Sequence, residues 1–247
     1  MRISVVIPTL NEALCVRKAI VSCWESGFEE VVVADGGSTD GTQRIAAEFG
    51  ALVVQGTRGR AAQLNLGAQH AAGEVLLFLH ADNWLSAAAG QQIRSSLEEE
   101  TISAGAFRQH IEARGYLYRL LECGNAARVG WSGLAYGDQA IFMRRDVFGK
   151  LGGYPDVSLM EDLLLMRKFR KLGRVALLPG PVYVSPRRWQ RKGVLLQTLR
   201  NWSLVTAERL GVSPNRLARF YPAHSDQSAD HLPSVTLEER LATPIDP

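Results

Sequence analysis

Cysteine is scarce in this sequence of 247 residues, which contains only Cys15, Cys23 and Cys123. The three thiols form no CxxC pair, and their odd number argues against a disulfide framework. They are also too few for a structural zinc site, which takes four ligands. We therefore expect reduced, buried thiols, which are typical of a cytoplasmic protein.

Long apolar runs are lacking as well. The run that begins at Ile3 is cut at Pro8, which makes it too short for the apolar core of a signal peptide. The run at 75–79 falls far short of the roughly 20 residues that a bilayer-spanning helix needs. We expect a cytoplasmic protein that is soluble or is held, at most, at the inner surface of the plasma membrane.

The chain has little excess charge of either sign, with 28 basic and 25 acidic side chains. A net charge of +3 does not predict a nucleic-acid partner. The basic residues are unevenly spread, however, because the segment 187–219 has Glu208 as its only acid. Its basic residues are Arg187, Arg188, Arg191, Lys192, Arg200, Arg209, Arg216 and Arg219. This local excess indicates an anionic partner, and peripheral contact with an anionic membrane is one candidate.

Buried β-branched runs alternate with helical patterns in the first half of the chain. The predicted strands are 3–7, 31–34, 51–54 and 75–79, and the predicted helices are 12–26, 39–49, 61–72 and 86–98. Continuous apolar strands that alternate with helices form a parallel sheet covered on both faces. We therefore predict an α/β, Rossmann-like fold whose ligands bind beyond the carboxyl ends of the strands.

The second half mixes strand-like and helical segments. The patterns favour strands at 104–112, 139–144 and 182–185, and helices at 115–128, 163–171 and 194–210. An apolar stripe on the helix at 115–128 is expected in the core, and it consists of Tyr116, Leu117, Leu120, Leu121 and Cys123. The helix at 194–210 either packs on the domain or is an amphipathic element that rests on anionic lipid.

Small, polar and charged residues gather after each of the four N-terminal strands, in the loops 8–12, 35–41, 56–60 and 80–83. Turn chemistry explains any one loop, but carboxylates and an arginine are not required by turns. A dinucleotide fingerprint is excluded, because no glycine follows the first strand and Ser38 breaks the pattern after the second. A P-loop is excluded because the only Gly-Lys pair is followed by Leu151.

The loop sequences resemble those of family-2 glycosyltransferases, which have the GT-A fold. Residues 5–12 read VVIPTLNE and residues 33–42 read VADGGSTDGT, similar to the VIPxxNE and VDDGSTDGT of that family. The triplet HAD at 80–82 stands in the place of its DxD, and GDQ at 137–139 and MED at 160–162 match later motifs. RRW at 187–189 with GVSP at 211–214 is similar to a small subgroup, the radical-SAM/selenodomain-associated transferase 2 proteins.

The resemblance implies a single GT-A domain at 1–222, with a mostly parallel central sheet, helices on both faces and a smaller mixed region on the acceptor side. It assigns nucleotide binding to 1–100 and the acceptor side to 101–222, and we expect 223–247 to be a mobile tail. The implied activity is an inverting, metal-dependent hexosyl transfer from a nucleotide-diphosphate sugar to an acceptor hydroxyl. Ser185 replaces the glutamine of the QxxRW motif of processive members, which favours a single transfer to a lipid-linked or small acceptor.

The same resemblance implies which residues bind the donor. Asp35 matches the aspartate that faces the base, and a carboxylate accepts a hydrogen bond from uracil or from guanine, although we expect UDP more than GDP. Glu12 is a candidate for the ribose hydroxyls, unless it is simply an acid in the first turn of a helix. The remaining donor-binding candidates are Pro8, Thr9, Arg60 beside the diphosphate, and Asp138 beside the sugar, the last with an ordinary loop acid as the alternative.

Asp82 is the metal ligand that the resemblance implies, for Mg²⁺ or Mn²⁺, which bind one or two carboxylates together with phosphates and water. His80 departs from the first acid of the motif. It could act through water, favour Mn²⁺, or be a buried structural histidine.

Asp162 matches the catalytic base of the family, which must take the proton of the acceptor hydroxyl. Glu161 would lie beside the acceptor or the diphosphate, Arg188 would neutralise the diphosphate, and Trp189 would stack on a sugar. The alternative for the two acids is that they only complement a helix dipole.

Two other functions remain open. A GT-A-like nucleotidyltransferase needs a glycine-rich loop with a basic residue after the first strand, and residues 8–12 lack both. A catalytically weak nucleotide-sugar binding protein is favoured only by His80.

Overall fold

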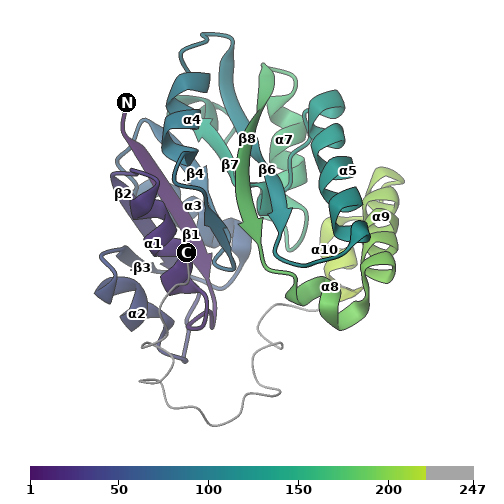
Figure 1. The fold of residues 1–247 in the computed structure, drawn as a ribbon, viewed down its shortest axis with the longest axis horizontal. Helices are drawn as coiled ribbons and strands as arrows, with labels where there is room; N and C mark the ends of the chain where they lie inside the picture. Colours follow the sequence, from purple (N-terminus) through teal and green to yellow (C-terminus); the bar gives the residue numbers. More distant parts are fainter. Residues whose placement is uncertain (221–247) are drawn as a thin grey trace.

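The structure is a computed structural model that describes residues 1–220, apart from the side chains of residues 188, 191 and 192. The predicted tail at 223–247 lies outside them. Within these residues the strands form one sheet in the order β3-β2-β1-β4-β7-β6-β8-β5 (Figure 1). They are β1 (Ile3–Thr9), β2 (Glu30–Asp35), β3 (Leu52–Gln55), β4 (Val75–Phe78), β5 (Asn83–Leu85), β6 (Ile102–Ile111), β7 (Ile141–Arg144) and β8 (Arg174–Val184).

Helices cover both faces of the sheet. The first face is covered by α1 (Val16–Glu25), α2 (Thr42–Glu48) and α4 (Ala89–Ser96), and the second by α3 (Arg60–His70), α5 (Tyr116–Ser132), α6 (Arg145–Lys150) and α7 (Glu161–Phe169). Along β1, Val5 and Ile7 pack into the first layer and Val6 into the second, so the strand is buried on both sides. This confirms the predicted α/β fold.

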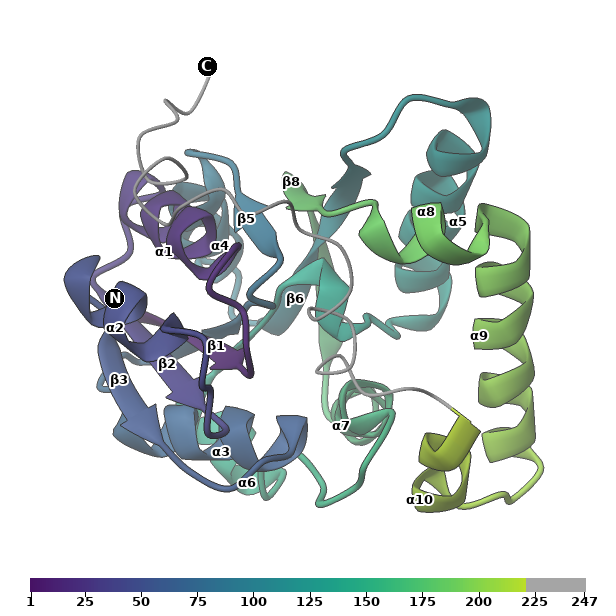
Figure 2. The same ribbon diagram turned by 90° about the horizontal axis from the view of Figure 1, so that it is seen from below.

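A third group of helices follows β8. It consists of α8 (Arg187–Lys192), α9 (Val194–Arg209), α10 (Pro214–Leu217) and the short 3₁₀ helix η2 (Ala218–Phe220). Two views show that α8, α9 and α10 lie at the same end of the molecule as α5, far from α1 and α2 (Figures 1 and 2).

The direction of the strands defines where ligands can bind. Strands β1, β2, β3 and β4 are parallel, whereas β7 is antiparallel to β4. The carboxyl ends of the first four strands and the start of β7 therefore share one edge of the sheet. The chain leaves β1 toward β2 on one side and later returns to β4 on the other, so the topological switch point lies between β1 and β4.

Several element boundaries differ from the sequence prediction, and two of the differences have clear local reasons. The first helix begins at Val16 rather than at residue 12, because Asn11 has a φ of 56° and residues 12–15 form a turn. Strand β8 is longer than the predicted 182–185. Its first part was not predicted, because Pro179 and Pro181 argue against a strand there. The register against β6 shifts between Phe107 and Gln109, beside these prolines.

The predicted apolar stripe at 115–128 is mostly not in the core. Tyr116, Leu117, Leu120 and Cys123 are exposed, and only Leu121 packs against a buried cluster. The expectation of three buried thiols is likewise wrong for Cys123, since only Cys23 is buried and Cys15 is half-buried. The sequence pattern is amphipathic, but α5 packs its other side, with Ala126 and Val129, into the core, so this stripe faces outward.

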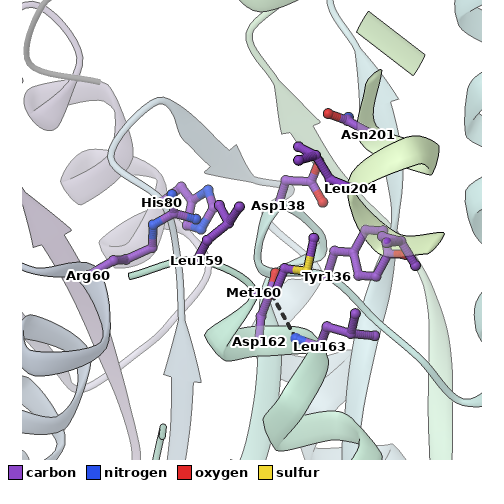
Figure 3. Close-up of a pocket in the computed structure, with 11 residues that line it drawn as sticks. Arg60, His80, Tyr136, Asp138, Leu159, Met160, Asp162, Leu163, Asn201 and Leu204 are labelled. Carbon is purple, nitrogen blue, oxygen red and sulfur yellow. Dashed lines mark hydrogen bonds between the residues drawn. The ribbon is translucent and has the colours of Figure 1, made fainter. Parts of the chain in front are cut away.

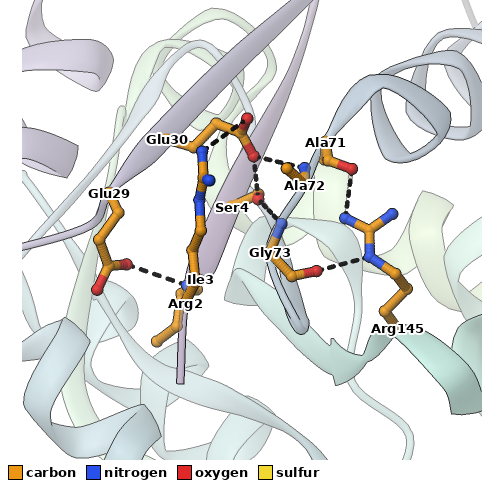
Figure 4. A network of polar contacts seen from close by, with 9 residues as sticks. All are labelled: Arg2, Ile3, Ser4, Glu29, Glu30, Ala71, Ala72, Gly73 and Arg145. Carbon is orange, nitrogen blue, oxygen red and sulfur yellow. Dashed lines mark hydrogen bonds and ion pairs between the residues drawn. The ribbon is translucent and has the colours of Figure 1, made fainter.

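A polar network fastens the opposite edge of the sheet (Figure 4). The guanidinium of Arg145 donates hydrogen bonds to the carbonyls of Gly73 (2.6 Å), Ala68 (3.0 Å) and Ala71. Two of these carbonyls belong to the last turn of α3 and its cap, where backbone acceptors lack helical partners. Arg145 therefore fixes the carboxyl end of the helix whose amino end reaches the switch point.

We expect Arg145→Ala to lower the free energy of unfolding by about 2–4 kcal/mol, since three acceptors lose a charged donor. Urea denaturation followed by circular dichroism measures this change. Lys150→Ala is the matched control, because its ion pair with Asp146 is exposed and should contribute less than about 1 kcal/mol. Equal stability of the two variants would contradict the assigned role of Arg145.

Candidate active site

The loops that follow β1 and β2 are joined by reciprocal hydrogen bonds. The backbone N–H of Asn11 donates to Ser38 Oγ (2.8 Å), and the N–H of Thr39 donates to Asn11 Oδ1 (2.9 Å). A second pair of contacts runs from the N–H of Ala13 to Asp40 Oδ2 and from the N–H of Glu12 to Thr42 Oγ1. The two loops therefore form one rigid wall at the switch point.

The buried side chain of Asp35 accepts the hydrogen bonds that hold this wall in place. Its side chain is fully buried, and Thr9 Oγ1 and Ser38 Oγ donate to its Oδ2. Its Oδ1 accepts from the N–H groups of Gly37 and Ser38 and from Gln43 Nε2. Burial alone would raise the pKa of Asp35, but these hydrogen bonds outweigh it and lower the pKa below its usual value.

The resemblance implied that Asp35 presents a carboxylate edge to the base, and this contact stays a prediction. Both of its oxygens already accept hydrogen bonds within the chain. Thr9 is also fully covered and serves as one of these donors. Both residues therefore position the loop, and Pro8 and Glu12, which are half-buried, remain nearer to solvent.

Arg60 is the first residue of α3, where a positive charge is disfavoured by the helix dipole. Its Nη1 lies 3.3 Å from Oε1 of Glu161, the first residue of α7. Glu161 is only 2% exposed, and burial raises its pKa despite Arg60, with the neighbouring charge of Asp162 raising it further. The ion pair joins the two halves of the chain beneath the site.

A pocket opens beside this ion pair, with about 660 Å³ of empty space that is partly open to solvent. Figure 3 shows the side chains of Arg60, His80, Asp138 and Asp162 around it. These residues come from α3, the loop after β4, the 3₁₀ helix η1 (Gly137–Gln139) and α7. The structure thus brings together three of the predicted site residues with His80. The rest of the wall is mainly apolar, and part of it belongs to α9: Asn201, Leu204 and Val205.

The carboxylate of Asp162 is held in place by backbone donors. Its Oδ2 accepts from the N–H of Gly137, and its Oδ1 accepts from the N–H of Leu163 at 2.7 Å. Each carboxylate oxygen has two lone pairs, so each can accept one further hydrogen bond. A Cβ on Gly137 would lie 2.6 Å from His80 Nε2 and 3.2 Å from Asp162 Oδ2, so an added methyl group would force the side chain of His80 to shift.

Asp82 lies at the same edge of the sheet, just after His80, but it does not line this pocket. Arg187, at the start of α8, is attracted by Asp82 and Glu12 and donates a hydrogen bond to Cys15 Sγ. Burial raises the pKa of Cys15 to about 11, although Arg187 opposes this, so the thiol is neutral near pH 7. Nothing in the sequence distinguishes Arg187 from the basic residues close to it, which are Arg188, Arg191 and Lys192.

Trp189 anchors α8 to the sheet. Its side chain is 7% exposed and packs with Ile111 and Val184, with the ring of Tyr118 edge-on at 6.5 Å. The stacking of Trp189 on a sugar stays a prediction. The side chain of Arg188 lies outside the described structure, and its contact with a diphosphate stays a prediction.

The acidic side chains near the switch point can bind a metal ion only together with a ligand that supplies the remaining coordinating atoms. Among residues 1–220, no three histidine, cysteine, aspartate or glutamate side chains are close enough together to hold a metal ion by themselves. Mg²⁺ and Mn²⁺ commonly take one or two carboxylates with phosphate oxygens and water. Asp82 is therefore compatible with a metal that is shared with a diphosphate.

None of the described helices is both long enough and apolar enough to span a membrane.

Comparison with known families settles the class of the protein. The family model for glycosyl transferase family 2 matches residues 4–196. The chain belongs to glycosyltransferase family 2. In this family-2 glycosyltransferase, the match covers both the donor loops and the second half as far as the start of α9.

Two curated relatives of this glycosyltransferase come from Haloferax volcanii. Glycosyltransferase AglJ is 44% identical over 52 residues, which are 21% of this chain and 17% of AglJ. Glycosyltransferase AglE is 33% identical over 91 residues, which are 32% of this chain and 30% of AglE. The matched region thus spans less than a third of each relative.

Solved structures confirm the GT-A fold. TarS from S. aureus, residues 1–349, gives a TM-score of 0.62 at 21% identity and covers 75% of this chain and 61% of that one. Mannosyltransferase PcManGT from Pyrobaculum calidifontis, in complex with GDP-Man and Mn²⁺, gives 0.60 at 24% identity and covers 89% and 69%. Glucosyl-3-phosphoglycerate synthase from Mycobacterium tuberculosis, with Mn²⁺, UDP and glucosyl-3-phosphoglycerate, gives 0.53 at 22% identity and covers 74% and 70%.

Proposed function

We propose that this glycosyltransferase moves a hexose from a nucleotide-diphosphate sugar to an acceptor hydroxyl, with inversion at the anomeric carbon. The observation that supports this most directly is the pocket in which Asp162 lies with Arg60, His80 and Asp138 at the active edge of the sheet. We expect UDP as the nucleotide rather than GDP. TarS has been solved with UDP-GlcNAc and the mycobacterial synthase with UDP, whereas the Pyrobaculum enzyme was solved with GDP-Man.

In the proposed reaction, the acceptor oxygen attacks the anomeric carbon while the bond from that carbon to the diphosphate oxygen breaks. The hydroxyl proton passes to a carboxylate oxygen of Asp162, and the nucleoside diphosphate leaves with the bonding electron pair. The two backbone N–H groups that hold Asp162 orient its remaining lone pairs. Attack and departure on opposite faces of the sugar produce the inversion.

The leaving diphosphate requires positive charge. Arg60 reaches the pocket from α3, and Arg187 reaches the neighbouring wall from α8. Guanidinium groups bind phosphate oxygens with charge-assisted hydrogen bonds, so both suit this role. Mg²⁺ or Mn²⁺, held by Asp82 and the diphosphate, would neutralise further charge when bound, with His80 in reach of the same region.

The apolar wall of the pocket supports an acceptor with an apolar part. Leu159, Leu163 and Leu204 contribute to it beside the polar groups. We therefore propose a lipid-linked or small hydrophobic acceptor, a single transfer rather than polymer synthesis, and action at the inner face of the plasma membrane. The resemblance of RRW and GVSP to the radical-SAM/selenodomain-associated transferase 2 subgroup remains part of this proposal.

Release of free nucleoside diphosphate tests the proposal against its rivals. The full chain is incubated with a panel of UDP- and GDP-sugars, Mg²⁺ or Mn²⁺, and candidate acceptors. An acceptor-dependent release of diphosphate supports glycosyl transfer. A nucleotidyltransferase would instead exchange pyrophosphate with a sugar phosphate, and binding without any release would indicate a catalytically weak nucleotide-sugar binding protein.

Gly137 offers a sharp test of the pocket geometry, because it separates His80 from Asp162. Gly137→Ala is expected to lower kcat by about 10- to 100-fold, since displacement of a catalytic group by about 1 Å has effects of this size. Donor affinity should change little. Gly124→Ala is the control, because nothing lies within 4 Å of the added methyl group. An unchanged kcat for Gly137→Ala would contradict the placement of Asp162.

A further inference from the structure

The outer face of α9 is apolar over 195–202, the reverse of the usual pattern for a surface helix, and Ser203, Thr206 and Arg209 continue that face toward the end of the helix. Leu195, Leu196, Leu199 and Trp202 are between 60% and 67% exposed. At 3.6 residues per turn these four positions share one side of the helix. The buried Leu204 lies on the opposite side, toward the pocket.

The outer face of α5 has the same character. Its most exposed positions carry no charge: Tyr116, Leu117, Leu120, Cys123, Gly124, Ala127, Gly130 and Trp131. Arg119 flanks them, and its side chain is paired with Glu122 at 2.9 Å. Trp131 is 96% exposed, the largest exposure of any large apolar side chain among the described residues. Isolated apolar side chains on a surface need no explanation, but a helix face without charge does.

The two faces belong to one end of the molecule. Figures 1 and 2 both show α5 and α9 there. A buried cluster joins them, because Trp189 at the start of this helical segment packs near Tyr118 and Leu121 of α5 and Val194 of α9. We call the exposed apolar side chains of α5 and α9 together the outer apolar surface.

The segment that carries α8 to η2 is basic. Its described arginines include the exposed Arg209, Arg216 and Arg219, together with Arg200, which donates to the carbonyl of Phe220, whereas Arg187 turns away toward Cys15. The one acid, Glu208, is paired with Arg167 at 2.6 Å, so its charge is already neutralised. An apolar face among cationic groups matches a bilayer that contains anionic lipid. A second copy of the chain fits less well, because pairing this end with itself would bring the two basic segments together.

We propose that the outer apolar surface docks on an anionic membrane. The inner face of α9 lines the pocket with Asn201, Leu204 and Val205, so the same helix would separate the bilayer from the site of transfer. A lipid-linked acceptor could then reach Asp162 around this helix. The docking follows from the surface itself, whereas the lipid-linked acceptor rests on the proposed function.

Vesicle flotation of the full chain tests the docking. The protein is mixed with vesicles of phosphatidylcholine alone or of equal parts phosphatidylcholine and phosphatidylglycerol. We expect it to float with the anionic vesicles, and Leu199→Glu with Trp202→Glu to reduce the bound fraction about tenfold or more, because two apolar contacts are replaced by charges that anionic lipid repels. Leu52→Glu with Leu172→Glu is the matched control, since both leucines are exposed elsewhere.

Absence of flotation with anionic vesicles would overturn the docking. So would equal loss in the control variant, or a dimer in light scattering that the α9 substitutions dissociate, because a second copy would then cover the surface. Thermal melting of each variant shows whether it is folded. Diphosphate release with a water-soluble acceptor is measured in parallel. Flotation without transfer would count against the proposed function alone, and transfer without flotation would count against the docking alone.

Discussion

The Asp162→Asn variant is expected to lose turnover by about 100- to 10,000-fold, which is the range that general base catalysis contributes. An amide cannot accept the acceptor's proton, so the attacking oxygen must carry that proton into the transition state. Binding of the donor nucleotide should survive, because Asp162 faces the pocket and does not belong to the β1 and β2 loops. Single-turnover kinetics and calorimetric titration with UDP measure the two effects separately.

The substitution also removes one acceptor of a backbone hydrogen bond, because both carboxylate oxygens are used and an amide has one oxygen. A loss of about 1 kcal/mol in unfolding free energy is therefore expected and does not account for the lost turnover. Asp156→Asn serves as control, since Asp156 is exposed in the loop before α7. An Asp162→Asn variant with a rate near that of the parent would reject Asp162 as the base.

The second large effect is expected at Asp82. Asp82→Asn should reduce turnover by about 100-fold or more, since the carboxylate that anchors the metal beside the diphosphate is lost. The binding of Mn²⁺ gives a readout that is independent of catalysis. It is measured as the loss of the electron paramagnetic resonance signal of the free ion. The described side chains offer no self-sufficient cluster, so the parent protein should bind Mn²⁺ weakly alone and strongly with UDP.

Asp82→Asn should abolish the increase in Mn²⁺ affinity that the addition of UDP causes in the parent protein. Asp40→Asn is an informative comparison, because Asp40 is also an acid of a donor loop but its oxygens accept from Ala13 and Thr42 within the wall. It should affect stability more than metal binding. If Asp82→Asn kept its UDP-dependent Mn²⁺ binding, Asp82 would not be the metal ligand.

The order of strands and helices in the first half could be predicted, because each element is signalled locally. β-branched runs such as that of β1 are buried on both faces, and the helical patterns between them predict helices, although α2 begins at Thr42 rather than at the predicted 39. The position of Asp162 at the first turn of α7 was also predictable from its motif. These features depend on a few adjacent residues, which is the range that sequence patterns report.

The features that escaped prediction depend on contacts between distant segments. The saturation of Asp35 by five donors needs Thr9 and Gln43 in place, and neither pattern nor motif shows that all its lone pairs are used. The outward stripe of α5 has the same spacing as a core stripe, and only the packing of the other side of the helix, with Ala126 and Val129, turns it to solvent. The participation of Arg187 depends on where α8 places it relative to Cys15.

The reciprocal bonds between the β1 and β2 loops have a consequence for engineering this enzyme. Asn11 and Ala13 of the first loop form hydrogen bonds with Ser38, Thr39 and Asp40 of the second. A chimera that imported one loop from a homologue with a different nucleotide preference would leave several amide donors unsatisfied. Swaps of donor specificity should therefore transplant both loops as a single cassette.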